Sequence, residues 1–230
     1  MSRRLQKKQI FSKLENGSWP EVQEYLDHSE DKHLINHLFS AICSTNAACK
    51  WHAVSGFGRI VPKIASMNVE SARIVMRRFL WSLNDESGGI GWGAPESMAE
   101  VMVHSDQLFD EYCHMLLSYA KEDGPELCQD CNFIELPALQ QGVLWGIARL
   151  LACKNEKMLE REIEDDLVKY LDSDDMIVRG YALICLSYSK KRFSIDAIAP
   201  LLTNQYTFSL YWENVFKNVC ISDIAKKILQ

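Results

Sequence analysis

The fold is decided by one stretch of the sequence, Asp174-Asp175-Met176-Ile177-Val178-Arg179-Gly180-Tyr181-Ala182. The segment Asp172–Asp174 just before the helix supplies side-chain oxygens of the kind that cap helix N-termini. Residues 177–188 are nearly all apolar or small, which predicts a helix buried on most of its sides. An acidic turn that opens onto a buried helix indicates an array of packed helices.

The same arrangement recurs earlier in the chain. The stretch Asn46-Ala47-Ala48-Cys49-Lys50-Trp51-His52-Ala53 has the same spacing, with Lys50 in the place of Arg179. Glu96 and Gln140 stand near that position in two further segments, so that the four positions are 46, 44 and 39 residues apart. A period of about 40–47 residues is typical of HEAT repeats, in which each repeat is a pair of helices.

These two stretches resemble the turn and second helix of a HEAT repeat, including the repeats of the bilin-lyase (PBS-lyase) HEAT-like proteins. The chain also resembles a group of bacterial HEAT-like proteins, a resemblance that implies no activity. In HEAT repeats the acidic turn and the following arginine form a ladder between neighbouring repeats. The resemblance therefore implies structural roles for Asp174, Asp175 and Arg179.

Helical periodicity runs through almost the whole chain, and we expect an all-α fold, an α-α superhelix (HEAT-like solenoid) of about five helix pairs. The expected pairs are 32–43 with 47–61, 70–83 with 94–104, 108–121 with 133–153, 158–171 with 175–190, and 195–202 with 207–220. In the segment 70–83, the pattern places Ile74, Val75, Phe79 and Leu80 on one side of the helix. We expect a single domain over residues 1–230, with an N-terminal cap at 1–31 and a C-terminal cap at 222–230.

Composition limits the class of protein. The 230 residues are 47% hydrophobic and 24% charged, which is a normal globular balance. The net charge of −6 argues against a nucleic-acid partner, because phosphate binding favours a basic surface. No apolar run is long enough for a membrane helix, and no secretory signal is present, so we expect a cytoplasmic protein.

Two further features concern the N-terminus and the cysteines. Residues 1–14 contain five basic residues and no acidic one, and we interpret them as a capping helix with Leu5, Phe11 and Leu14 turned inward. A transit peptide or a membrane-surface helix is the alternative. Five cysteines lie within apolar helical patterns and are interpreted as reduced core thiols: Cys43, Cys113, Cys153, Cys185 and Cys220.

A glycine-rich loop interrupts the helical pattern at residues 84–93, where Pro95 and Glu96 then begin a helix. Backbone amides at a helix N-terminus can hold an anion or a ligand edge, and tryptophans can form stacking walls. The alternative is an elaborate turn whose tryptophans seal the edge of the array. On the first interpretation the ligand-binding candidates are Trp81, Asn84, Asp85, Glu86, Gly89, Gly91, Trp92 and Glu96.

A second loop contains Cys128 and Cys131 in a Cys-x-x-Cys arrangement, which can hold a metal or form a redox pair. Four zinc ligands are not assignable from the spacing, so incidental thiols are the alternative. Both loops should lie on the same edge of a repeat array, with Trp145 of the following helix close by. We predict that this edge is the binding side.

Three hypotheses of function follow. The first is a non-catalytic HEAT-repeat scaffold that binds a protein partner. The second is a small-ligand or metal-binding protein that uses the loops at 84–93 and 128–131; the sequence does not identify a cofactor. The third is a HEAT-type DNA-repair glycosylase, suggested only by the basic stripe Arg73, Arg77 and Arg78. This stripe is more simply explained by pairing with neighbouring acids.

Overall fold

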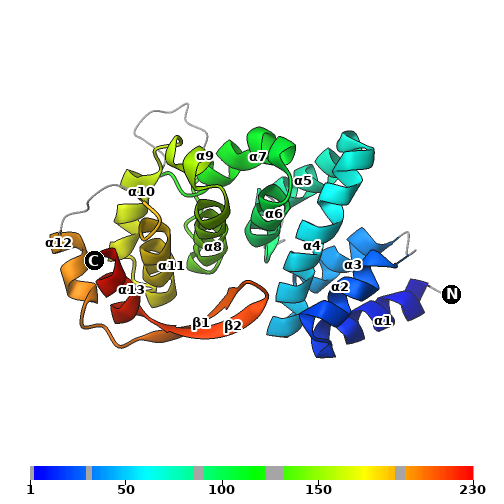
Figure 1. Cartoon of the computed structure of the whole chain (residues 1–230), viewed down its shortest axis with the longest axis horizontal. Helices are drawn as coiled ribbons and strands as arrows, with labels where there is room; N and C mark the ends of the chain where they lie inside the picture. The colour runs from blue at the N-terminus through cyan, green and yellow to red at the C-terminus, as the bar shows by residue number, and fades with distance from the viewer. Residues whose placement is uncertain (1–2, 30–32, 85–90, 123–131, 190–194, 230) are drawn as a thin grey trace. The chain divides into compact units, whose positions relative to one another are not determined.

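A computed structural model describes residues 3–29, 33–84, 91–122, 132–189 and 195–229 (Figure 1). The chain forms two compact units, Met1–Tyr112 and Cys113–Gln230. The boundary falls inside one continuous helix, α7 (Asp106–Ser118). The expectation of a single domain remains a prediction.

The first unit consists of helices, and its longest one, α4, is central. Its other helices are α1 (Arg3–Asn16), α2 (Trp19–Asp27), α3 (Leu34–Ala41), α5 (Val69–Leu83) and α6 (Ala94–Val103). All five pack against α4 (Ala47–Met67). The buried Phe57 and Phe79 and the half-buried Phe39 form an aromatic cluster, with ring centroids 4.7–4.9 Å apart. Aromatic rings in edge and tilted contacts at this distance stabilise the packing beyond their buried area.

Polar side chains fix where these helices begin. The Asn46 side chain accepts a hydrogen bond from the Cys49 amide at 2.9 Å and caps α4. Asn68 caps α5 in the same way through the Ser71 amide, at 3.1 Å. An asparagine at this position satisfies one of the amides that the first helical turn leaves unpaired.

The second unit contains α8 (Pro137–Cys153) and α11 (Met176–Leu186), which pack closely on each other. Shorter elements complete it: α9 (Asn155–Leu159), α10 (Glu164–Lys169), η1 (Tyr170–Asp172), α12 (Ile195–Ile198), η2 (Ala199–Leu201), β1 (Thr207–Trp212), β2 (Val215–Cys220) and α13 (Ile221–Ile228). Asp175 caps α11 by accepting from the amides of Ile177 and Val178, at 2.8 and 3.0 Å. The cap is therefore one residue later than the predicted Asp172–Asp174 segment.

The predicted helix at 207–220 is wrong. These residues form an antiparallel hairpin of β1 and β2, with Trp212 paired to Val215 across the two-residue turn Glu213-Asn214. Both turn residues have positive φ, 53° and 64°, as the favoured type I′ turn requires. The buried residues Phe208 and Leu210 alternate with the exposed Thr207 and Ser209, which is strand periodicity.

The predicted helix at 158–171 is also divided. Helix α9 ends at Leu159 and α10 begins at Glu164, with η1 continuing to Asp172. Between them Glu162 adopts a positive φ of 51°, a conformation that a right-handed helix does not contain.

The ladder that the HEAT resemblance implies has counterparts within each unit. In the first unit, Lys50 on α4 donates to Glu96 on α6 at 2.8 Å. In the second, Gln141 on α8 donates to the cap residue Asp175 at 3.0 Å. Arg179 also donates, to the Ser173 carbonyl oxygen of the turn. Gln140, the residue at the predicted position, donates instead to the Ile134 carbonyl oxygen at 2.8 Å. These contacts join the helices within each unit, and the HEAT type of the repeat stays a prediction.

Burial corrects two groups of predictions. In α1, Leu14 is fully buried as predicted and Ile10 is buried beside it, but Leu5 is 47% exposed. Cys113 and Cys185 are core thiols, whereas Cys43 and Cys153 are exposed and Cys220 is half-buried, and none of the five is in a disulfide. An apolar neighbourhood in the sequence does not decide which helix face a residue occupies. Within the described residues, no helix has the length and apolar character needed to cross a membrane.

Candidate partner-binding face

The outward face of α5 carries two exposed large apolar side chains. Ile74 is 59% and Trp81 is 75% exposed. The buried residues of this helix are Ala72, Val75, Met76 and Phe79. At about 100° per residue, Ile74 and Trp81 lie on the side of the helix directly opposite the centre of that buried set.

The prediction that Ile74 lies on the same side as Val75 and Phe79 is therefore wrong, and its exposure was missed at the sequence level. The signal was present, because Val75, Met76 and Phe79 already define a complete core stripe. A residue seven positions before Trp81 shares its face of the helix.

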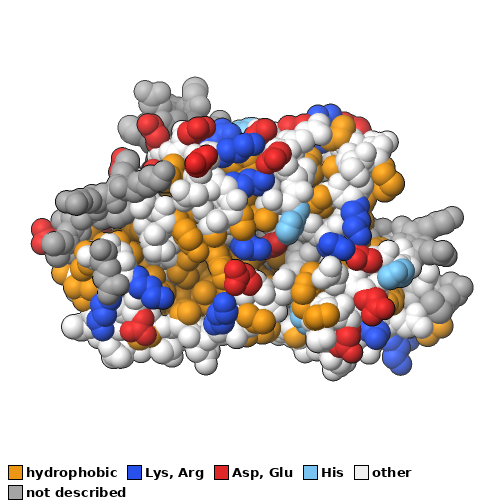
Figure 2. Space-filling model, in the orientation of Figure 1, with side chains coloured by type: hydrophobic (Ala, Val, Ile, Leu, Met, Phe, Trp, Pro, Cys, Tyr) orange, Lys and Arg blue, Asp and Glu red, His pale blue; other side chains and the backbone are white. Residues whose placement is uncertain are grey.

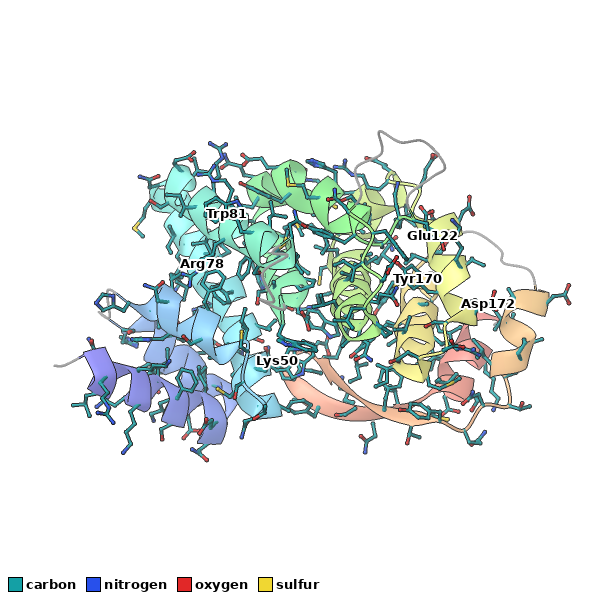
Figure 3. All side chains as sticks on the ribbon, turned by 180° about the vertical axis from the view of Figure 1, so that it is seen from behind. Lys50, Arg78, Trp81, Glu122, Tyr170 and Asp172 are labelled. Carbon is teal, nitrogen blue, oxygen red and sulfur yellow. The ribbon has the colours of Figure 1, made fainter. Side chains whose placement is uncertain are left out.

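Arg78 lies between these two residues along α5, one turn from Trp81 (Figure 3). Its guanidinium carbon is 3.8 Å from the centroid of the Phe39 ring, and Nη1 donates to the Asn36 side-chain oxygen at 2.7 Å. Partial burial lowers the pKa of Arg78, but an arginine remains charged at neutral pH. The cation is thus held in a fixed position beside an exposed tryptophan.

The other two arginines of the predicted basic stripe are paired with acids, as expected from the sequence. Arg73 makes a two-pronged contact with Glu111, at 2.8 and 2.5 Å, and a further contact with Glu70 at 3.3 Å. Arg77 contacts Glu70 at 2.6 Å. These hydrogen bonds lower the pKa of Glu70 and raise that of Arg77. Their positive charges are largely neutralised within the unit.

Charges of both signs also alternate over the molecular surface shown in Figure 2. Nucleic-acid binding requires cations that are available to phosphates. The pairing of Arg73 and Arg77 leaves Arg78 as the one member of the stripe without a carboxylate contact among those described, and the glycosylase hypothesis stays an untested alternative.

The glycine-rich loop is described only at its two ends. Asn84 follows the last residue of α5 as its C-cap, and the loop candidates Asp85, Glu86 and Gly89 lie outside the described residues. A Cβ atom at Gly91 would lie 2.8 Å from the Ser82 carbonyl oxygen, so that only glycine fits this approach. Gly93 has a φ of 73° and caps α6, and Trp92 is 37% exposed.

Glu96 has a structural role in the first turn of α6. It is only 4% exposed and forms the ladder ion pair with Lys50. Lys50 in turn lies 5.2 Å from the centroid of the Trp51 ring. The ligand role predicted for Glu96 stays a prediction, and its contacts are those of a residue that joins α4 to α6.

Trp145 belongs to the core of the second unit. It is 1% exposed, and its indole N–H donates to the Tyr211 carbonyl oxygen at 2.8 Å. Its ring also meets Trp212 edge-on, with centroids 6.1 Å apart. These contacts tie β1 to α8.

The second predicted loop, with Cys128 and Cys131, lies outside the described residues. Among the residues that the structure does describe, no group of three or more histidine, cysteine or acidic side chains is placed to hold a metal. The proposed closeness of the two loops and the metal role of this pair stay predictions.

Comparisons with known proteins find similarity in structure. Neither the family models nor the curated proteins include a match to this chain. Among solved structures it resembles a designed armadillo repeat protein, with 13% identity, a TM-score of 0.53 and coverage of 99% of this chain and 93% of the other. It also resembles a computationally designed armadillo repeat protein for modular peptide recognition. The identity is 12%, the TM-score is 0.52, and the match covers 99% of this chain and 93% of the other. A third similar structure is that of an engineered protein, with 14% identity, a TM-score of 0.55 and coverage of 99% of this chain and 92% of the other. At this identity the similarity shows the fold alone, which is that of a helical repeat protein, as predicted.

Proposed function

We propose that this chain is a non-catalytic repeat protein of the HEAT type that binds a protein partner through the outward face of α5. The observation that carries the proposal is the exposure of Trp81 and Ile74 on one line of a helix, opposite its core. Single exposed apolar residues are ordinary, but a tryptophan and an isoleucine on either side of a fixed arginine form a small mixed surface.

The residue types of this face are those found at binding hot spots of protein interfaces. Tryptophan and arginine are enriched among the residues whose truncation costs most at protein interfaces. Arg78 is already stacked on Phe39, so that little side-chain entropy is lost when it is ordered by a partner. A solved protein with this fold was designed for modular peptide recognition, which supports a peptide or protein as the occupant.

The partner is best identified by cross-linking from within the face. A photo-reactive residue is introduced at Ile74 in one variant and at Tyr206, an exposed aromatic residue of the second unit, in a control variant. We expect one protein to be cross-linked from position 74 and not from position 206. Equal cross-linking from both positions, or none from position 74, would remove the α5 face from the proposal.

A further inference from the structure

The N-terminal helix α1 carries a second surface of different chemistry. A shallow, open groove on its surface is lined by Arg4, Leu5, Lys7, Lys8 and Phe11. Three of these side chains are cations and two are apolar, and no acidic residue is among them. The groove therefore combines three cations with two apolar side chains in a chain whose net charge is −6.

The cations of this groove differ from those of α5. Arg73 and Arg77 are paired with glutamates. Within the described residues, Arg4, Lys7 and Lys8 form no ion pair, and Lys7 lies instead over the Phe11 ring, 5.3 Å from its centroid. Their charges are thus available to an acidic ligand.

The helix is anchored by its other side. Ile10 and Leu14 are fully buried, and α1 packs against α2, α3 and α4. Its main apolar stripe is thereby used within the first unit. The groove is left with Leu5, which is 47% exposed, and the half-buried Phe11. A helix that lies in a membrane interface needs a broad apolar face, which α1 does not offer to a membrane.

We propose that this groove docks an acidic peptide segment of a partner protein, one that places a bulky apolar side chain between Leu5 and Phe11 and carboxylates beside Arg4, Lys7 and Lys8. Charge complementarity selects the acidic ligand, and the two apolar side chains select the accompanying hydrophobic residue. This surface is on a different helix from the face of α5, and its test does not depend on Trp81.

The test uses the full chain and a fluorescein-labelled peptide of repeated Glu-Glu-Leu, with a peptide of repeated Gln-Gln-Leu as its uncharged match. Fluorescence anisotropy should show binding of the first peptide that weakens markedly between ionic strengths of about 0.05 and 0.3 M. Equal affinity for both peptides, or insensitivity to salt, would overturn the proposal. This arm needs no variant.

Variants then locate the site. The double substitution Lys7→Glu, Lys8→Glu should weaken binding about tenfold, because two attractive contacts become repulsive. The matched control is Lys226→Glu, Lys227→Glu, which changes the same charge on two exposed adjacent lysines of α13. The control should stay within about twofold of the unmodified chain. Equal weakening in both would attribute binding to net charge and contradict the proposal.

Two further experiments test the apolar contact at Leu5 and the class of ligand. Leu5→Gln should weaken peptide binding by about threefold, since an apolar contact is lost while the charge is kept. Phosphatidylcholine–phosphatidylserine vesicles provide the membrane arm. Binding of the chain to these vesicles without binding to the Glu-Glu-Leu peptide would overturn the proposal in favour of a lipid surface.

Discussion

Asp27, at the end of α2, is the centre of an ion cluster that joins α2 to α4. Its carboxylate accepts from Arg59 at 2.9 and 2.6 Å and from Lys63 at 2.5 Å. These contacts hold the pKa of Asp27 well below its usual range, with the Arg59 hydrogen bond as the largest cause. Because Arg59 and Lys63 are 40% and 47% exposed, solvent weakens the pairing.

We expect Asp27→Asn to lower the free energy of unfolding by about 1 kcal/mol at pH 7. A depressed folded-state pKa stabilises the fold above the unfolded pKa of about 4, and this stabilisation is lost as the pH falls further towards the folded pKa. Urea unfolding should therefore show a difference between the two proteins that narrows below about pH 4. A difference of constant size from pH 7 to pH 3 would contradict the ion-cluster explanation. Asp223→Asn, at an exposed position of α13, is the control and should have little effect.

Asn214 tests the turn chemistry at a single position. Its φ of 64° is tolerated by asparagine and glycine but is strained for a β-branched residue. We expect Asn214→Val to be less stable than Asn214→Gly by about 1–2 kcal/mol in urea unfolding. Equal stability of the two variants would mean that the turn does not have this conformation.

At the scale of elements, the hairpin is the largest departure from the sequence prediction. It packs beside α8 and α11 (Figure 1), and at Gly180 the approach is so close that an added Cβ atom would clash with the Phe208 ring. The Phe208 ring also meets Tyr181, with centroids 5.3 Å apart. Since Phe208 is only 6% exposed, it has little room to move.

We expect Gly180→Ala to lower the free energy of unfolding by about 2 kcal/mol through overpacking against Phe208. Phe208→Leu removes the ring atoms that the new methyl group meets. The double variant should therefore be more stable than the sum of the two single losses, by about 1 kcal/mol in a double-mutant cycle. Additive losses would show that Gly180 and Phe208 do not touch.

Sequence periodicity predicted some elements well and others poorly, for identifiable reasons. Helices α4 and α11 were predicted because each contains a long run of apolar and small residues. The hairpin was missed because its strands are short and its turn, Glu213-Asn214, lacks the glycine that usually marks such a turn. Helix α9–α10 was predicted as continuous because the break depends on the conformation of Glu162, a residue that usually favours helices.

The candidate site was predicted from the sequence less accurately than the fold was. Trp81 was named as a ligand wall, and it is highly exposed on α5. Trp145 was named with it, but its burial against β1 depends on a hairpin that the sequence prediction did not contain. Ile74 was placed on the side of Val75 and Phe79, although its position seven residues before Trp81 puts it on the exposed face of the helix.

At the scale of the whole molecule, the point to decide is whether the two compact units unfold together or separately. The boundary between the two compact units falls inside α7, whose hydrogen-bonded backbone continues through it. In repeat proteins, stability is the sum of each repeat and its interfaces with its neighbours. We predict that the chain unfolds as a single domain.

Hydrogen exchange of the Gly180→Ala variant tests this prediction. The substitution is in the second unit, so a single cooperative domain should lose amide protection in α4 of the first unit as well as in α8 and α11. Loss of protection confined to residues after Cys113 would show that the two units unfold independently.

The most direct test of the proposed partner-binding role is the affinity of the cross-linked partner for the Trp81→Ala variant, measured by calorimetric titration. The variant should bind about 30-fold more weakly, a loss of about 2 kcal/mol, with its unfolding free energy unchanged within about 0.5 kcal/mol. Tyr206→Ala, which removes an exposed aromatic residue elsewhere, should bind like the unmodified chain. Unchanged affinity of the Trp81→Ala variant would contradict the assignment of α5 as the partner-binding face.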